Sequence, residues 1–251
     1  MYIILFVILL LIGISGYKVY DYLKEQNEAQ KSITQLSNKA VTLSETTKSD
    51  GEYMHKEAEA VPPPCPITVD FEALRKENND IIAWLYLPDT VINYPVLQAD
   101  DNEYYVRRLT NGYWNIAGSI FADCRNASDF SDPNTVIYGH NMTNDTMFGT
   151  LMDYRSQEYY DAHPYMYIIT PEKKYRLELL TGFVTLADSE VYSFPQTAEE
   201  TEEKLLAWLE ASDFEPAFEY TRGSKLATLS TCAENYGNKR YVVIGALKET
   251  E

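Results

Sequence analysis

Near its C-terminal end the chain reads Thr228-Leu-Ser-Thr-Cys232-Ala-Glu-Asn-Tyr-Gly-Asn-Lys-Arg240-Tyr-Val-Val-Ile244. Two apolar and β-branched runs flank seven residues, 233–239, rich in Asn and Gly, which is typical of two joined strands. The strands are expected at 225–231 and 240–247. If they pair antiparallel, Cys232 and Arg240 lie side by side at one rim, where a guanidinium would favour a thiolate and hold a developing oxyanion. The plain alternative is a small buried Cys beside a surface Arg.

Outward from this pair of strands, the sequence predicts a β-rich domain. Short apolar runs bounded by turn residues predict further strands at 81–87, 91–97, 118–122, 135–138, 165–170 and 174–186. Helices are expected at 71–78, where Asp70 is the cap, at 101–109, and at 197–211, where Thr197 and Glu200 form a capping box. Many short strands with few helices predict a mainly β fold, built as a closed or nearly closed barrel.

A second motif, Tyr138-Gly-His-Asn141, follows the strand expected at 135–138. Gly139 lets the backbone bend or approach a neighbour at this point. A lone His at a strand end is usually a surface residue. A cysteine nucleophile, however, needs an adjacent acid or base, and His is the usual one. His140 is therefore the candidate partner of Cys232.

The first 17 residues contain no charged side chain, which is about the shortest run that spans a bilayer. We interpret residues 1–17 as an uncleaved membrane anchor, because a signal peptide needs a small-x-small cleavage site and 13–16 offers only a poor one. A buried core helix is disfavoured because a polar stretch follows at once. Lys18 and Lys24 follow the run and no basic residue precedes it, so the positive-inside rule alone would place the later domain in the cytoplasm.

Residues 18–66 are polar and mixed, and they end in Val61-Pro-Pro-Pro-Cys65-Pro66. This composition predicts a spacer that is partly helical and closes in a stiff polyproline segment. Cys65 and His55 are interpreted as incidental linker residues. The folded domain is therefore expected at 67–251.

Composition and residue counts exclude several classes of function. The net charge of −17 would repel nucleic-acid phosphates, and no cluster of Lys or Arg offsets it. The three cysteines, at 65, 124 and 232, are too few and odd in number for a disulfide framework. No Cys-x-x-Cys pair exists and the three histidines, at 55, 140 and 163, are scattered, so no zinc site is expected. Cys124 is interpreted as structural, and His163 lies in a loop without catalytic context.

Taken together, these motifs resemble the sortase family, specifically its class B. The resemblance rests on Thr-Leu-Ser-Thr-Cys232 followed by Arg240, and on Tyr-Gly-His140-Asn about ninety residues earlier. It extends over roughly residues 67–248. Further segments similar to class B sequences are Ile92-Asn-Tyr-Pro-Val-Leu-Gln98, Asp101-Asn-Glu-Tyr-Tyr105, Gly118-Ser-Ile-Phe-Ala-Asp123 and the helix at 197–211.

The resemblance implies a sortase-type closed β-barrel of about eight strands, with N-terminal helices and one long inserted helix. It also implies a transpeptidase in which Cys232 attacks the carbonyl of a Thr in the C-terminal sorting signal of a secreted protein. His140, when protonated, passes a proton to the leaving amine, and Arg240 holds the oxyanion or the substrate backbone. An amine of the peptidoglycan precursor or cross-bridge then resolves the thioacyl-enzyme.

By the same resemblance, Asn93, Leu97, Tyr138 and Ser230 match positions that contact the signal peptide. One departure concerns the residue after the nucleophile. Some class B members have Glu directly after the Cys, whereas this chain has Ala233-Glu234, so that contact is not carried over. The calcium site of another sortase class is not carried over either, because no acidic residues are grouped as it requires, and no cofactor is expected.

Sortases are anchored with the catalytic domain outside the cell, so the resemblance overrides the weak charge signal and implies a single-pass membrane protein. Three functions stay open. The favoured one is transfer of secreted proteins to the cell wall, with pilin polymerisation as a variant. A Cys-His peptidase that hydrolyses its acyl-enzyme shares the first half-reaction. A membrane-anchored binding module is disfavoured by the intact set of Cys232, His140 and Arg240.

Overall fold

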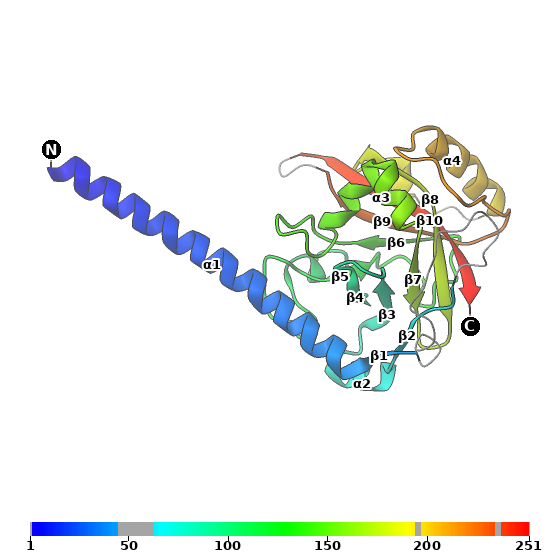
Figure 1. The fold of residues 1–251 in the computed structure, drawn as a ribbon, viewed down its shortest axis with the longest axis horizontal. Helices are drawn as coiled ribbons and strands as arrows, with labels where there is room; N and C mark the ends of the chain where they lie inside the picture. Colours follow the sequence, from blue (N-terminus) through cyan, green and yellow to red (C-terminus); the bar gives the residue numbers. More distant parts are fainter. Residues whose placement is uncertain (1, 45–62, 194–196, 234–236, 251) are drawn as a thin grey trace.

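The computed structural model describes residues 2–44, 63–193, 197–233 and 237–250. At its centre lies a closed barrel with the strand order β10-β8-β7-β3-β4-β5-β6-β9 (Figure 1). Neighbouring strands are antiparallel except for the parallel pairs β4–β5 and β6–β9. The mainly β barrel predicted from the many short strands is therefore confirmed.

Each predicted barrel strand forms within a few residues of its expected bounds. Local composition suffices here because Pro, Gly and Asp interrupt the ladders between apolar runs. The strands are β3 (Ile81–Tyr86), β4 (Asn93–Leu97), β5 (Ile120–Ala122), β6 (Asn134–Tyr138), β7 (Tyr165–Ile169), β8 (Lys174–Leu186), β9 (Leu226–Cys232) and β10 (Lys239–Thr250).

Side chains that alternate along these strands divide the buried residues between an inner core and outer clusters. Inside the barrel, Leu85, Ile137 and Leu229 are fully buried. Trp84 and Leu97 face outward into a second cluster, which we call the outer cluster. Because apolar side chains also point outward from the barrel, other elements must cover its outer wall.

Two of the three predicted helices form, α2 (Phe71–Glu77) and α4 (Ala198–Glu210). Their caps form as predicted: Asp70 accepts a hydrogen bond from the backbone N–H of Ala73, and Thr197 accepts one from that of Glu200. At the third place the chain makes only a 3₁₀ turn, η2 (Tyr104–Arg107). Three short elements had no sequence prediction because they are too brief to show periodicity: η3 (Gly149–Arg155), α3 (Gln157–Ala162) and η4 (Glu190–Tyr192).

One long helix, α1 (Tyr2–Ala40), contains the expected anchor and the first part of the expected spacer. Its N-terminal half projects away from the barrel (Figure 1). An 18-residue window of α1 has a mean hydropathy of 2.3 and none of it is buried. Of the helices in the described part of the chain, α1 is the one long and apolar enough to cross a membrane.

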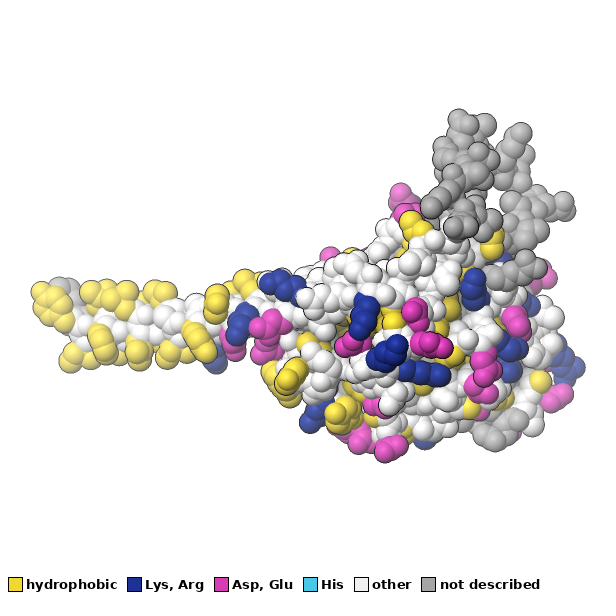
Figure 2. Space-filling view, turned by 90° about the horizontal axis from the view of Figure 1, so that it is seen from below, with side chains coloured by type: hydrophobic (Ala, Val, Ile, Leu, Met, Phe, Trp, Pro, Cys, Tyr) yellow, Lys and Arg dark blue, Asp and Glu magenta, His cyan; other side chains and the backbone are white. Residues whose placement is uncertain are grey.

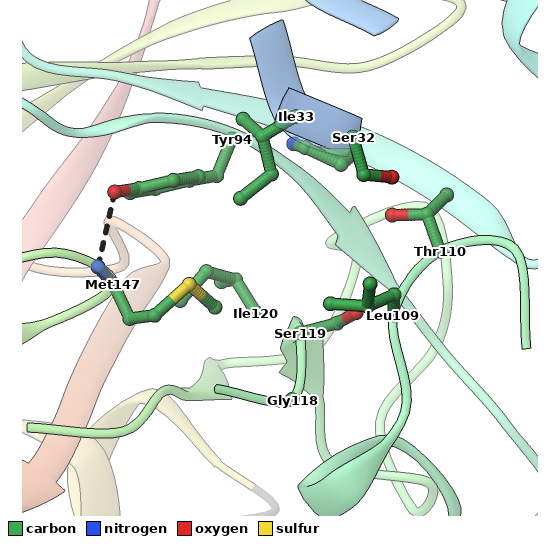
Figure 3. Close-up of a pocket in the computed structure, with 10 residues that line it drawn as sticks. Ser32, Ile33, Tyr94, Leu109, Thr110, Gly118, Ser119, Ile120 and Met147 are labelled. Carbon is green, nitrogen blue, oxygen red and sulfur yellow. Dashed lines mark hydrogen bonds between the residues drawn. The ribbon is translucent and has the colours of Figure 1, made fainter. Parts of the chain in front are cut away.

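The C-terminal half of α1 packs on the barrel wall. Ala29, Leu36 and Ala40 are buried, and Ile33 packs beside them, so an apolar stripe recurs every three or four residues. Figure 3 shows Ile33 over the wall beside Tyr94, where a cavity of only about 10 Å³ is left. After α1, the short strand β1 (Val41–Leu43) pairs with β2 (Ile67–Val69).

The segment expected as a spacer thus includes packed residues. Cys65, interpreted as incidental, is 3% exposed and belongs to the outer cluster with Leu36 and Ile67. The stripe on α1 escaped the sequence analysis because polar residues separate its few apolar members. Residues 45–62, which include His55, lie outside the described part of the chain.

Candidate active site

Cys232 is the last residue of β9, and it is half-buried. The register of the antiparallel pair β9–β10 places Arg240 directly opposite Cys232. This is the arrangement that the antiparallel hypothesis predicted for the two residues. Because paired residues point to the same face of a sheet, both side chains lie on the outer face of the barrel.

His140 reaches the other side of Cys232 through the parallel pair β6–β9. In that pair Tyr138 lies opposite Ser230, and the ladder continues because the backbone N–H of Gly139 donates to the Ser230 carbonyl at 3.1 Å. One step further, the Asn141 side-chain amide donates to the Cys232 carbonyl at 2.8 Å. His140, two residues beyond the end of β6, therefore flanks Cys232 on the β6 side, as Arg240 flanks it on the β10 side.

The imidazole of His140 is oriented by the backbone. Its Nε2 lies 2.7 Å from the carbonyl oxygen of Val106. A carbonyl can only accept, so we assign the neutral ring a hydrogen on Nε2 and a lone pair on Nδ1. Burial lowers the pKa of His140; the bond to Val106 opposes this, and the charges of Arg107 and Arg240 lower the pKa further. The neutral ring is thereby favoured near pH 7, ready to accept a proton.

Arg240 is half-buried at the start of the return strand. Its Nη1 donates to the carbonyl of Lys239 at 3.0 Å and lies 3.5 Å from that of Gly237. Within the described residues, Arg240 forms no ion pair with a carboxylate. Glu234, the acid considered as its alternative partner, lies outside those residues. The guanidinium thus keeps donors that a substrate oxygen can use.

Two tyrosines form a wall beside Cys232. The hydroxyl of Tyr192, in η4, lies 2.8 Å from the Ser230 hydroxyl, and its ring stacks on that of Tyr138 with centroids 6.1 Å apart. Burial raises the pKa of Tyr192, while the charge of nearby Arg240 lowers it. Sequence reasoning missed Tyr192, because nothing in a connection between strands signals where it folds back.

A buried carboxylate fixes the ring of Tyr138. Asp123, directly after β5, is 0% exposed and accepts hydrogen bonds from Nε and Nη2 of Arg125 at 2.8 and 2.7 Å. It also accepts one from the Tyr138 hydroxyl at 2.8 Å. Burial alone would raise the pKa of Asp123, but the bonds from Arg125, together with those from Tyr138 and Asn102, hold it at about 2. This charged anchor orients Tyr138, and sequence reasoning missed it too.

Leu97, Tyr138 and Ser230 lie in one row across the outer face. Leu97 pairs with Phe121, Phe121 with Tyr138, and Tyr138 with Ser230. Leu97 itself is 0% exposed within the outer cluster. The row leads from β4 to β9, two residues before Cys232. Ser230, at its β9 end, is 2% exposed beneath Tyr192, whereas Tyr138 in the middle of the row is half-buried.

Asn93 lies at the beginning of β4, four residues before Leu97. Its side-chain oxygen accepts a 2.6 Å hydrogen bond from the indole of Trp84, and its amide lies 3.4 Å from the Ser37 hydroxyl of α1. The structure therefore groups Tyr138 and Ser230 with Cys232, whereas Asn93 is engaged with α1.

A family model described as the sortase domain matches residues 85–248 of this chain. The chain belongs to the sortase family. Sortase B of Listeria monocytogenes is 30% identical over 237 residues, which cover 93% of this chain and 90% of that protein. Sortase B of Staphylococcus aureus is 29% identical over 243 residues, covering 96% and 93%. This sortase is thus similar to sortase B proteins over nearly its whole length.

Solved sortase structures agree with this assignment. The crystal structure of Staphylococcus aureus sortase B superposes with a TM-score of 0.68 at 32% identity, covering 72% of this chain and 87% of that one. Sortase B of Bacillus anthracis in complex with AAEK1 gives a TM-score of 0.74 at 28% identity, covering 90% and 99%. The fold and family make this chain a cell-wall sortase, a cysteine transpeptidase in the general sense.

Proposed function

We propose that this sortase cleaves a C-terminal sorting signal after Thr and transfers the secreted protein to a peptidoglycan amine through a thioacyl-enzyme. The observation that carries the proposal is the alignment of His140, Cys232 and Arg240 at the ends of three adjacent strands. A thiol, an imidazole and a guanidinium in one row supply a nucleophile, a proton carrier and an oxyanion donor.

In the first half-reaction, the Cys232 sulfur bonds to the Thr carbonyl carbon. The carbonyl oxygen becomes an oxyanion, and Arg240 donates hydrogen bonds to it. His140, which carries the thiol proton, gives it to the leaving amine as the C–N bond breaks. The products are a thioester on Cys232 and the released C-terminal peptide.

In the second half-reaction, an amine of the peptidoglycan precursor or cross-bridge attacks the thioester. His140 takes the proton from this amine, the C–S bond breaks, and the thiol is restored. The new amide joins the secreted protein to the wall. A Cys-His hydrolase would form the same thioester. The two reactions differ only in the nucleophile that then attacks it, which is an amine here and water in the hydrolase.

Signal-peptide contacts are proposed for Tyr138 and Ser230 beside the nucleophile, and for Leu97 and Asn93 along β4. Tyr138 is half-buried, and Ser230 lies beneath Tyr192, so a peptide would reach Ser230 once Tyr192 moves aside. Leu97 and Asn93 are covered by the outer cluster and α1. A peptide can contact them only if α1 moves; otherwise they act indirectly, by supporting the residues that the peptide touches. We further propose that residues 1–17 anchor the chain in the cell membrane with residues 67–251 outside as the catalytic domain.

The test uses the full chain in detergent with a fluorogenic signal peptide, with and without triglycine or diaminopimelate. Transpeptidation predicts an amide product that grows with amine concentration at the expense of the free acid. Mass spectrometry of a quenched reaction should place the acyl group on Cys232. A product that stays entirely acid at high amine would instead support a Cys-His peptidase.

A further inference from the structure

The loop between η2 and β5, residues 108–119, exposes two adjacent aromatic side chains. Tyr113 is 74% exposed and Trp114 61%. The other two tryptophans of the chain, Trp84 and Trp208, are 0% and 9% exposed. Exposed Trp and Tyr side chains are typical of the membrane–water interface, where the apolar ring can contact lipid while the polar N–H or O–H group contacts water.

This aromatic loop rests directly on α1. The Asn115 side-chain amide donates to the Glu25 carbonyl at 2.9 Å, and the backbone N–H of Ile116 donates to the Glu25 carboxylate at 3.0 Å. Two contacts to one residue fix the loop to the helix at a defined height. That height relative to the apolar run of α1 decides what surrounds Tyr113 and Trp114.

Glu25 lies eight residues beyond Tyr17, the last residue of the uncharged run of α1. A hydrocarbon core of about 30 Å takes about 20 helical residues, which counted from Tyr2 end near Asp21. Lys18 falls within this count, but it is close enough to the end for its long side chain to carry the ammonium to the headgroups. Glu25 follows four residues later, a rise of about 6 Å. The headgroup layer on one side of a bilayer is about 5 to 8 Å thick. The aromatic loop therefore meets α1 at the level of the lipid headgroups.

The active site shares this side of the barrel. The Thr143 hydroxyl, in the loop that follows His140, lies 2.9 Å from the Tyr22 hydroxyl of α1. Figure 1 shows the end of β9 and the start of β10 on the side of the barrel toward the projecting half of α1. Figure 2 shows hydrophobic side chains along that projecting half, with charged ones where it meets the domain. Because α1 is continuous from Tyr2 to Ala40, it holds the barrel at a fixed height.

We propose that the aromatic loop is a second membrane contact, in which Tyr113 and Trp114 insert into the headgroup interface of the bilayer that α1 spans. The contact holds the Cys232 end of the barrel against the membrane surface. This inference rests on the membrane anchor of the proposed function and extends it. It suits a substrate whose sorting signal is followed by an apolar run, since that run would itself lie in the bilayer.

The first experiment measures tryptophan fluorescence of the full chain in phosphatidylcholine vesicles with brominated or plain acyl chains. Bromine should quench the parent, and Trp114→Phe should lose most of that quenching, because Trp84 and Trp208 are buried. A matched control moves the indole to a site of equal exposure on α4, Leu206, which is 60% exposed. In the Trp114→Phe/Leu206→Trp variant, bromine should have little effect.

A second variant tests the fixed height. Seven helix-forming residues inserted after Tyr20 would raise the domain by about 10 Å and rotate it by only about 20°. The quenching of Trp114 should then fall to the level of the control. Equal quenching with and without the insertion would overturn the rigid arrangement.

Flotation of the same samples separates the two hypotheses. A chain that floats with vesicles but shows equal Trp114 fluorescence in brominated and plain lipid overturns the inference and leaves the anchor standing. A chain that does not float overturns both. As a functional readout, Tyr113→Ser/Trp114→Ser should lower the rate several-fold on a signal peptide embedded in vesicles and leave the rate on a soluble peptide unchanged.

Discussion

The two sides of Cys232 are built in different ways. On one side, Arg240 is brought opposite by a single antiparallel hairpin whose strands are neighbours in the chain. On the other, His140 arrives through a parallel pair whose members are far apart in sequence; Asn141 and Cys232 are separated by 91 positions. We call these the Arg side and the His side of Cys232. Local sequence therefore determines the position of Arg240 on the Arg side, whereas the packing of the whole barrel determines that of His140 on the His side.

Packing around Gly139 shows how tightly the His side is held. A Cβ at this position would lie 2.5 Å from Ile120 Cδ1 and 2.6 Å from a ring carbon of Phe148. Only a residue without a side chain fits between these two core groups. The backbone that carries His140 is thus fixed by residues from other strands and loops, whereas Arg240 needs only its own hairpin.

Cys232, the proposed nucleophile between the two sides, gives the largest expected effect. Cys232→Ala should abolish turnover and leave the melting temperature near that of the parent, because the residue is half-buried and contributes little packing. Cys65→Ser and Cys124→Ser should keep most activity, although Cys65→Ser should lower the melting temperature because Cys65 is buried. Turnover by Cys232→Ala at the parental rate would contradict the mechanism.

The Arg side can be tested without disturbing the fold. Arg240→Lys keeps the charge but loses the fork of paired donors, so kcat should fall by about a hundred- to a thousandfold, with KM changing less. The exchange Lys239→Arg/Arg240→Lys moves the guanidinium to the neighbouring position, which points to the other face of the strand. It should not restore kcat. A near-parental kcat for Arg240→Lys would remove Arg240 from the catalytic groups.

The His side should instead respond to packing. Gly139→Ala forces a methyl group into a full core and should destabilise the fold by about 1 to 3 kcal/mol, with a fall in kcat because His140 is displaced. Gly223→Ala offers a control at a site where a Cβ would meet no atom within 4 Å, although φ is +84° there. It should cost stability but not kcat. Parental kcat in Gly139→Ala would show that the His side tolerates movement.

The smallest effect concerns protonation of His140. Burial places its folded pKa below the ordinary 6.5, so the unfolded chain binds the proton first as the pH falls. The contribution of neutral His140 to the free energy of unfolding is fully present above pH 6.5 and is lost as the pH falls from there through the pKa of the folded state. In this window the free energy of unfolding of the parent should therefore fall more steeply with decreasing pH than that of His140→Gln. The difference in slope should correspond to at most one proton taken up on unfolding.

A control for this measurement is His163→Gln, since burial also lowers the pKa of His163. Denaturant titrations between pH 5 and pH 8 would compare the three proteins. Parallel stability curves for the parent and His140→Gln would contradict the buried, neutral imidazole.

Local chemistry predicted most of the fold. Asp70 and Thr197 cap their helices, and the Asn- and Gly-rich connection lets Arg240 face Cys232. These features could be predicted because each depends on residues close together in the sequence. The packed part of α1 was not predicted, since Ala29 and Ile33 gain meaning only against a barrel wall that other segments build.

What the sequence by itself determined was the barrel strands, the two caps, the apolar run of α1, and the Cys232–Arg240 pair. Tertiary structure alone decided that Tyr192 closes over Ser230, that Asp123 holds Tyr138, and that Asn93 is engaged with α1. The physical reason is range. Hydrogen bonds of caps and hairpins join neighbours in the chain, whereas the walls of this site are made by side chains that only closure of the barrel and docking of α1 bring together.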